Sequence, residues 1–143
     1  MSPFSDLSDV AAAGRSLRSD ILHRILGLND PSEIEKYVTE YLLKYVGQGG
    51  IFDYQRRAYP YGKDGFTQLR QFRNVANFNV GLIAQQAGIP LPVVLWKAGG
   101  YAAKKSSNYR PDQLFGLDPQ TKEWIEWGYY HGTKGTFDAV PRP

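Results

Sequence analysis

The chain has 143 residues, with 17 lysines and arginines against 14 aspartates and glutamates, and a formal net charge of +3. A chain of this length can form one domain with a hydrophobic core that needs no disulfides or metal ions to stabilise it. The absence of cysteine excludes a disulfide framework, a thiolate zinc site and a thiol nucleophile. The positive charge favours association with a polyanion, such as anionic cell-wall glycan or nucleic acid. Because the basic residues are scattered, an ordinary solvated surface explains them equally well.

Neither a membrane span nor a signal peptide is expected. The longest apolar runs, such as residues 90–96, fall far short of the roughly 20 residues that cross a bilayer. Residues 1–6, Met-Ser-Pro-Phe-Ser-Asp, lack the basic and apolar regions of a signal peptide. If the protein acts outside the cytoplasm, we expect another component to carry it there.

Two helices are predicted in the first third of the chain. Apolar residues recur at near-helical spacing from Leu17 to Leu28, and residues 29–31 end that segment. Asp30 and Pro31 then provide an N-cap and a first-position proline for a second helix. Its apolar face consists of Ile34, Tyr37, Val38, Tyr41, Leu42 and Tyr45. The glycines of residues 47–50 end it.

The remaining two thirds alternate helices with loops. Residues 51–65 are irregular and predict a structured loop or a short hairpin. A helical stripe covers residues 66–87, with a break near Val75 as one option, and another helix runs from Pro92 towards Lys104. Residues 105–117 read as an ordered surface loop, and Asp118 with residue 119 opens a last helix. We therefore expect a mostly α, single compact domain over residues 1–143, with about five to six helices and a lysozyme-like arrangement as one form.

Asp53 is the first candidate for catalysis. It follows a glycine-rich helix exit and is flanked by Phe52 and Tyr54, whose rings disfavour the charged carboxylate and suit it to acid–base work. Glu40 lies near the C-terminal end of the second predicted helix, where the helix dipole also disfavours a carboxylate. Since glycoside hydrolysis generally uses two carboxylates, Glu40 and Asp53 form a candidate pair. The alternatives are a turn-capping aspartate and an exposed helix glutamate.

Amide and aromatic side chains form a candidate binding lining. The predicted members are Tyr54, Gln55, Asn77, Asn79 and Tyr101. Amides offer hydrogen bonds to sugar hydroxyls, and aromatic rings offer apolar faces. Because residues two apart point to different helix faces, we expect one of the two asparagines to be buried and structural while the other faces the site. For the aromatic residues the alternative is core filling.

Asp118 is expected chiefly to cap the last helix, with a catalytic role as the second option. His23 and His131 are the only histidines, and either is a candidate general base. Two histidines without cysteine or a carboxylate at ligand spacing do not predict a zinc site, so no metal and no cofactor are expected. No phosphate loop, nucleophile elbow or metalloprotease motif occurs in the sequence.

Several short motifs between Gly49 and Tyr130 occur in a fixed order. They are Gly49-Gly50-Ile51-Phe52-Asp53-Tyr54-Gln55, Asn77-Phe78-Asn79-Val80-Gly81, Ala98-Gly99-Gly100-Tyr101-Ala102, Phe115-Gly116-Leu117-Asp118-Pro119 and Trp124-Ile125-Glu126-Trp127-Gly128-Tyr129-Tyr130. Together they resemble the bacterial polymorphic toxin type 44 domain, with its Trp-Asp-Tyr-Lys, Gly-Asn-Phe-Asn, Gly-Asp-Asp-Pro and terminal Ile-x-x-Gly-x-x-Tyr-Tyr motifs. The resemblance leaves the N-terminal helices of residues 1–48 outside it.

The chain departs from that pattern at three positions. Gln55 stands in place of lysine, Ala76 in place of glycine, and Leu117 in place of the first of two aspartates. A mechanism needing two adjacent acids, such as metal binding, is thereby put in doubt. The resemblance implies an effector domain deployed between competing bacteria, secreted as part of a larger protein and countered by an immunity protein. It does not identify the substrate.

Three functions are open at this point. The first is a peptidoglycan hydrolase of lysozyme type, a muramidase, delivered into the periplasm of a target bacterium, with Asp53 or Glu40 as the acid and no metal. The second is a ribonuclease toxin that uses His131 or Asp53, with Arg56 and Arg57 on phosphate. The third is a non-enzymatic binding module in which the Asn-Phe-Asn segment only packs helices.

Overall fold

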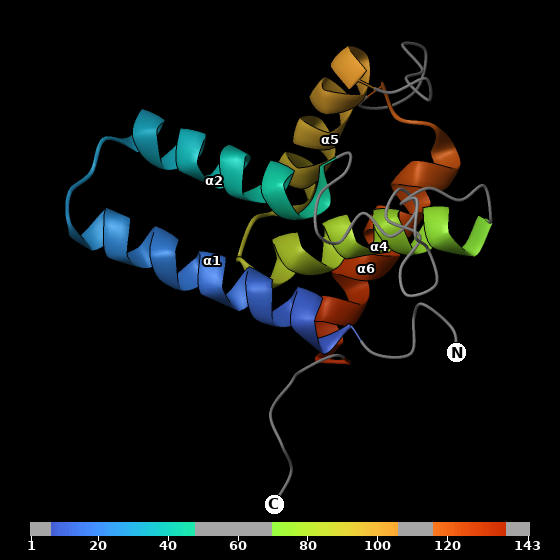
Figure 1. Ribbon diagram of the computed structural model, residues 1–143, viewed down its shortest axis with the longest axis horizontal. Helices are drawn as coiled ribbons and strands as arrows, with labels where there is room; N and C mark the ends of the chain where they lie inside the picture. The colour runs from blue at the N-terminus through green and yellow to red at the C-terminus, as the bar shows by residue number, and fades with distance from the viewer. Residues whose placement is uncertain (1–6, 48–69, 106–115, 137–143) are drawn as a thin grey trace, which may run out of the picture.

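A computed structural model describes residues 7–47, 70–105 and 116–136 (Figure 1). These residues form five helices: α1 (Ser8–Leu26), α2 (Pro31–Val46), α4 (Arg70–Gln86), α5 (Leu91–Lys105) and α6 (Pro119–Lys134). No strand occurs within them, so the predicted mostly α, single compact domain is confirmed. The loop or hairpin predicted at 51–65 lies outside the described residues.

Two helix starts follow from aspartate–proline pairs. The Asp30 carboxylate accepts a hydrogen bond of 2.9 Å from the Ser32 backbone N–H at the start of α2. The Asp118 carboxylate accepts one of 3.3 Å from the Thr121 N–H at the start of α6. Each bond satisfies a backbone donor that the first helical turn leaves unpaired. Both predicted caps are confirmed.

Two helices differ from their predicted extents. α1 begins at Ser8, well before Leu17, because the buried residues Val10, Ala11 and Gly14 continue the inward face with small side chains that the apolar pattern underweights. α4 runs without interruption through Val75, which is fully buried. There is therefore no break in α4 at this position.

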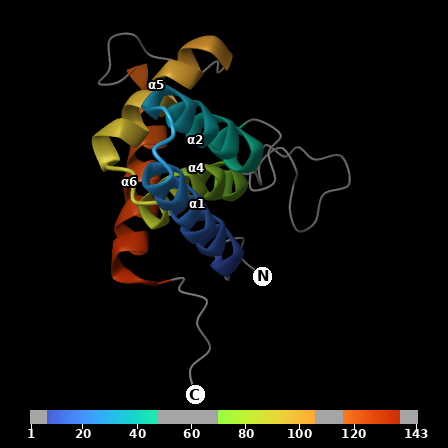
Figure 2. The same cartoon turned by 90° about the vertical axis from the view of Figure 1, so that its left-hand side faces the viewer.

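α4 lies at the centre of the core and packs against α1 and α6. One buried cluster joins α1 to α4 and consists of Leu7, Val10, Ala11, Val75, Phe78, Leu82 and Ile83. The other joins α1, α2, α4, α5 and α6 through Leu17, Val38, Ala84, Ala87, Ile89, Val94, Leu95, Leu117 and Ile125. In Figure 2, α6 runs down one side of the molecule beside α4.

Glycines bring α4 and α6 into backbone contact. A Cβ atom added at Gly81 of α4 would overlap the Ile125 carbonyl of α6, and one added at Gly128 would overlap the Phe78 carbonyl of α4. Gly14 of α1 similarly faces the Ile83 carbonyl of α4. Only a residue without a side chain permits such an approach. These contacts fix the position of α6 on α4.

α1 and α2 form a hairpin whose far end extends away from the core (Figure 1). The Tyr41 hydroxyl donates a 2.8 Å hydrogen bond to the Ala13 carbonyl, and the Tyr37 hydroxyl donates one of 2.6 Å to Asp20. These bonds tie the two helices together along their length.

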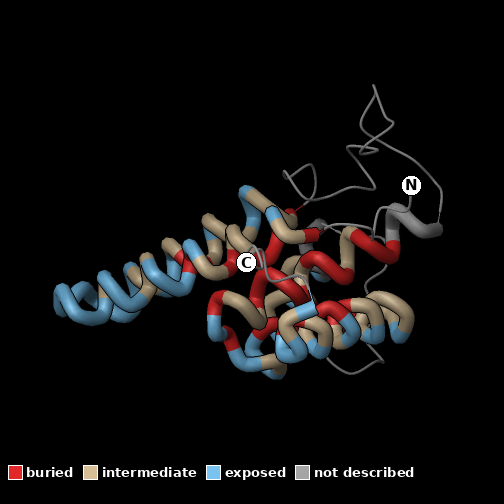
Figure 3. Tube along the Cα trace, turned by 90° about the horizontal axis from the view of Figure 1, so that it is seen from below, coloured by how far each residue is buried: buried red, intermediate tan, exposed pale blue. Residues whose placement is uncertain are grey.

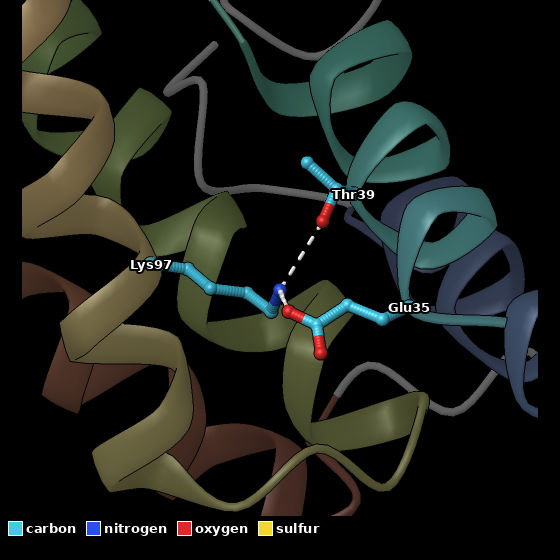
Figure 4. Close-up of polar contacts among 3 residues, drawn as sticks. All are labelled: Glu35, Thr39 and Lys97. Carbon is cyan, nitrogen blue, oxygen red and sulfur yellow. Dashed lines mark hydrogen bonds and ion pairs between the residues drawn. The ribbon is translucent and has the colours of Figure 1, made fainter. Parts of the chain in front are cut away.

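A polar contact also ties α2 to α5. The Lys97 ammonium of α5 lies 3.0 Å from a Glu35 carboxylate oxygen and 3.1 Å from the Thr39 hydroxyl, both on α2 (Figure 4). Because Glu35 is largely exposed, this ion pair contributes little to the free energy of folding. Its main effect is on the orientation of α5 relative to α2.

Candidate functional site

The structure describes two of the three predicted catalytic residues, Glu40 and Asp118, and they belong to different helices. Asp53, with the predicted binding residues Tyr54 and Gln55, lies outside the described residues. Glu40 is exposed on α2. Asp118 is half-buried and caps α6. The described residues therefore give Asp118 a structural task and leave the predicted pairing of Glu40 with Asp53 as a prediction.

The Asn77–Gly81 segment belongs to the contact between α4 and α6. Asn79 is fully buried and Phe78 is 4% exposed, with its ring centroid 6.5 Å from that of Trp124. Asn77 is half-buried. One asparagine is thus inside the core and the other is not, as the helical spacing predicted. Tyr101, the remaining predicted binding residue, is half-buried on α5.

A shallow hollow of about 350 Å³ lies on the outer side of α6. Its lining within the described residues is Glu123, Glu126, Trp127 and Tyr130. These positions are spaced i, i+3, i+4 and i+7, which is one face of a helix. The opposite face carries the buried residues Ile125, Gly128 and Gly132, so the α4 contact turns the hollow outwards.

The rings around the hollow support one another. The centroids of Trp127 and Tyr130 lie 5.7 Å apart in an edge-on arrangement, and the imidazole of His131 stacks on Trp127 at 5.6 Å. His131 Nδ1 lies 3.0 Å from the Thr136 hydroxyl, and the Lys134 ammonium lies 5.3 Å from the Tyr130 centroid. Trp127 is nevertheless 44% exposed and Tyr130 49% exposed, so both present ring surface to a ligand.

Two carboxylates stand beside these rings. A Glu126 carboxylate oxygen accepts a 2.9 Å hydrogen bond from the Lys122 ammonium, whereas Glu123 is exposed. Residues three apart on a helix have Cβ atoms about 5–6 Å apart, so Glu123 and Glu126 are neighbours on the surface of α6. Rings with carboxylates beside them offer an apolar face and hydrogen-bond acceptors, which are the groups that a sugar ring and its hydroxyls can use. No cluster that could hold a metal occurs among the described residues.

None of the four residues that line the hollow is among the site residues predicted from the sequence. The available signal was the same spacing that predicts the helix, because acids and aromatics recur at 123, 126, 127 and 130 opposite Ile125 and Gly128. From the sequence, Trp127 and Tyr130 belong only to the motif that resembles the toxin domain, and neither has a predicted role there. His131 was selected only as a general base, and it lies in the ring cluster beside the hollow.

Comparison of the sequence with protein-family models gives no match, and comparisons with curated proteins and with solved structures give none either. The resemblance to the polymorphic toxin domain therefore stays a prediction. Within the described parts of the chain, no helix has the length and apolar character to cross a membrane.

Proposed function

We propose that this chain is an antibacterial effector domain that cleaves the glycan strands of peptidoglycan. The observation that supports the proposal is the α6 hollow, in which two carboxylates and two exposed rings lie together. The formal net charge of +3 favours approach to an anionic wall. Action in the periplasm of a target cell, and an immunity protein in the producing cell, are parts of the same proposal and rest on the motif resemblance.

In the proposed reaction, the aromatic rings bind the sugar and the two carboxyl groups transfer protons or attack the sugar. Trp127 and Tyr130 hold sugar rings by their apolar faces. One carboxylic acid protonates the departing glycosidic oxygen, while the other carboxylate activates water or attacks the anomeric carbon. We assign the carboxylate role to Glu126, which accepts a charge-assisted hydrogen bond from Lys122, and the acid role to Glu123. Asp53 remains the competing acid from the sequence.

Digestion of purified sacculi tests this function. We expect the protein to release soluble muropeptides, and Glu123→Gln or Glu126→Gln to lower the rate at least about 100-fold, since acid–base groups contribute about that much. Trp127→Ala should weaken binding to sacculi. Glu33→Gln, exposed on another helix, is the matched control and should leave the rate unchanged.

Two further variants separate the sequence-derived candidates. Asp118→Asn keeps an N-capping side chain, so lost activity with unchanged thermal stability would return a catalytic role to Asp118. Asp53→Asn keeps shape and removes the charge, and a rate equal to wild type would remove Asp53 from the mechanism. Intact sacculi after incubation with wild-type protein would reject the hydrolase proposal itself.

A ribonuclease is the second candidate because of the position of His131. Its imidazole stacks on Trp127, and Lys134 lies on the next turn of α6 over Tyr130. A general base, a cation and stacking rings are the groups that RNA cleavage needs. Total RNA incubated in parallel with the sacculi distinguishes the two, and His131→Gln should abolish cleavage of RNA only.

A non-enzymatic module would be favoured if neither substrate is cut. The buried positions of Phe78 and Asn79, together with Gly81 in contact with α6, agree with a packing role for the Asn-Phe-Asn segment.

A further inference from the structure

The tip of the α1–α2 hairpin carries four exposed aliphatic side chains. The exposed fractions are 50% for Leu22, 52% for Ile25, 81% for Leu26 and 91% for Leu28. Exposure increases towards the turn, and the hairpin end stands well clear of the buried core (Figure 3). Four large aliphatic side chains exposed within seven residues indicate an interaction surface, whereas exposed leucines that are scattered singly need no explanation.

Leu28 also adopts a backbone conformation that leucine disfavours. Its φ is 59°, in the left-handed region where a Cβ atom approaches the following carbonyl. The turn uses this conformation to end α1, because the Leu28 N–H donates to the Ile25 carbonyl and the Asn29 N–H donates to the Arg24 carbonyl. Glycine or asparagine fits such a position without strain. Leu28 is neither buried nor in a favoured backbone conformation. A contact with another molecule would account for a leucine at this position.

We propose that the hairpin tip inserts into a lipid surface. The hairpin end protrudes from the rest of the described molecule (Figure 3), and lipid chains close around a protruding apolar group, whereas a protein partner must offer a matching pocket. Residues 22–32 contain one formal positive charge, Arg24, and one formal negative charge, Asp30. Charge therefore gives the tip no preference for a polyanion, and transfer of the aliphatic side chains out of water is the driving force.

A second copy of the chain fits this surface poorly. Stable protein interfaces bury about 800 Å² on each partner, and four side chains at the end of a narrow hairpin fall well below that. Insertion into lipid must also be shallow. Asp30 follows Leu28 by two residues, and its carboxylate is held at the start of α2 by Ser32. The charged cap stays among the headgroups while Ile25, Leu26 and Leu28 enter.

The chain contains no cysteine, so Asn29→Cys provides a single thiol at the tip for a nitrobenzoxadiazole label. With phosphatidylcholine vesicles we expect the emission to shift to the blue and to increase. The same label on Lys44→Cys, at the other end of α2, should show no change. An unchanged tip signal would overturn the proposal.

Vesicle sedimentation with the full chain then tests the side chains. Leu26→Ser and Leu28→Gly should each lower the partition coefficient about tenfold or more, which is the expected effect of removing one buried leucine. Leu43→Ser, exposed at the opposite end of α2, is the control and should not. Because glycine relaxes the left-handed position, Leu28→Gly should melt at the wild-type temperature or about 2 °C higher, so lost binding cannot be attributed to unfolding.

Three other results would overturn the assignment. Equal partitioning of wild type and Leu28→Gly would remove the tip from membrane contact. Binding only to phosphatidylglycerol vesicles, abolished by salt, would make charge the cause. A dimer in light scattering that Leu28→Gly dissociates would place a second copy on the tip. The proposal does not rest on the glycan-hydrolase function, and neither test uses sacculi.

Discussion

Tyr41 illustrates how a single side chain links folding to pH. Its hydroxyl donates to the Ala13 carbonyl across the hairpin, and its ring packs 4.8 Å from that of Tyr45. Burial, together with the nearby Tyr45, raises the pKa of Tyr41 from the ordinary tyrosine value of about 10 to about 12. The neutral phenol is therefore the form that the folded protein favours.

The protein should consequently lose stability at alkaline pH. Between pH 10 and about 12 the unfolded chain releases the Tyr41 proton while the folded chain keeps it. The contribution of Tyr41 to the free energy of unfolding is therefore complete below pH 10 and is lost as the pH rises through 12. Tyr41→Phe should lose about 1 kcal/mol at neutral pH and flatten this alkaline slope. Urea unfolding between pH 8 and pH 12 measures both effects. Tyr130→Phe, half-exposed on α6, is the control, and an equal change in slope there would remove Tyr41 as the cause.

At the scale of elements, the contact between α4 and α6 depends on glycine from both helices. Gly81 fits against Ile125 and Tyr129, and Gly128 fits against Phe78 and Leu82. The atoms that an added Cβ would meet first are backbone atoms, which cannot rotate aside as a flexible side chain can. The two helices would have to separate to admit even one methyl group.

Gly81→Ala or Gly128→Ala should therefore destabilise the fold by about 3 kcal/mol, the upper end of the usual cost of overpacking. Gly100→Ala is the matched control because Gly100 is also helical and an added Cβ there would meet open space. That variant should be neutral or more stable by up to about 1 kcal/mol. Denaturant midpoints compare all three. A Gly128→Ala protein as stable as Gly100→Ala would contradict the close approach.

The sequence predicted features that depend on neighbouring residues and did not predict those that depend on contacts between helices. The starts of α2 and α6 are set by Asp30 and Asp118 with the prolines that follow them, and such local signals are readable without tertiary knowledge. The early start of α1 was not predicted because Gly14 becomes a core residue only where the Ile83 backbone lies against it, and Ala11 only within the cluster that also holds Ile83. The α6 hollow was missed for a related reason. Whether Trp127 is core or surface depends on which face of α6 meets α4.

At the scale of the whole molecule, the proposed function predicts a dependence on compartment. An enzyme that cuts peptidoglycan should lyse cells when exported to the periplasm and should do no harm in the cytoplasm. The exported Glu126→Gln protein, with the same fold and a matched surface, should be harmless. Growth curves of cells that express each form, with export signal and without, measure this. Growth arrest from the cytoplasm would instead favour the ribonuclease, and harmlessness in both compartments the binding module.

The paired glycines also determine how the hollow can respond to a ligand. Gly81, Gly128 and Gly132 each face the neighbouring helix, so α6 cannot slide by one turn along α4 without placing a larger residue at the point of closest approach. The glycine contacts therefore fix both the position of α6 along α4 and its rotation about its own axis. Ligand capture should proceed through rotamer changes at the rim, on the nanosecond scale, and association rates should lack the slow phase that a moving helix would introduce.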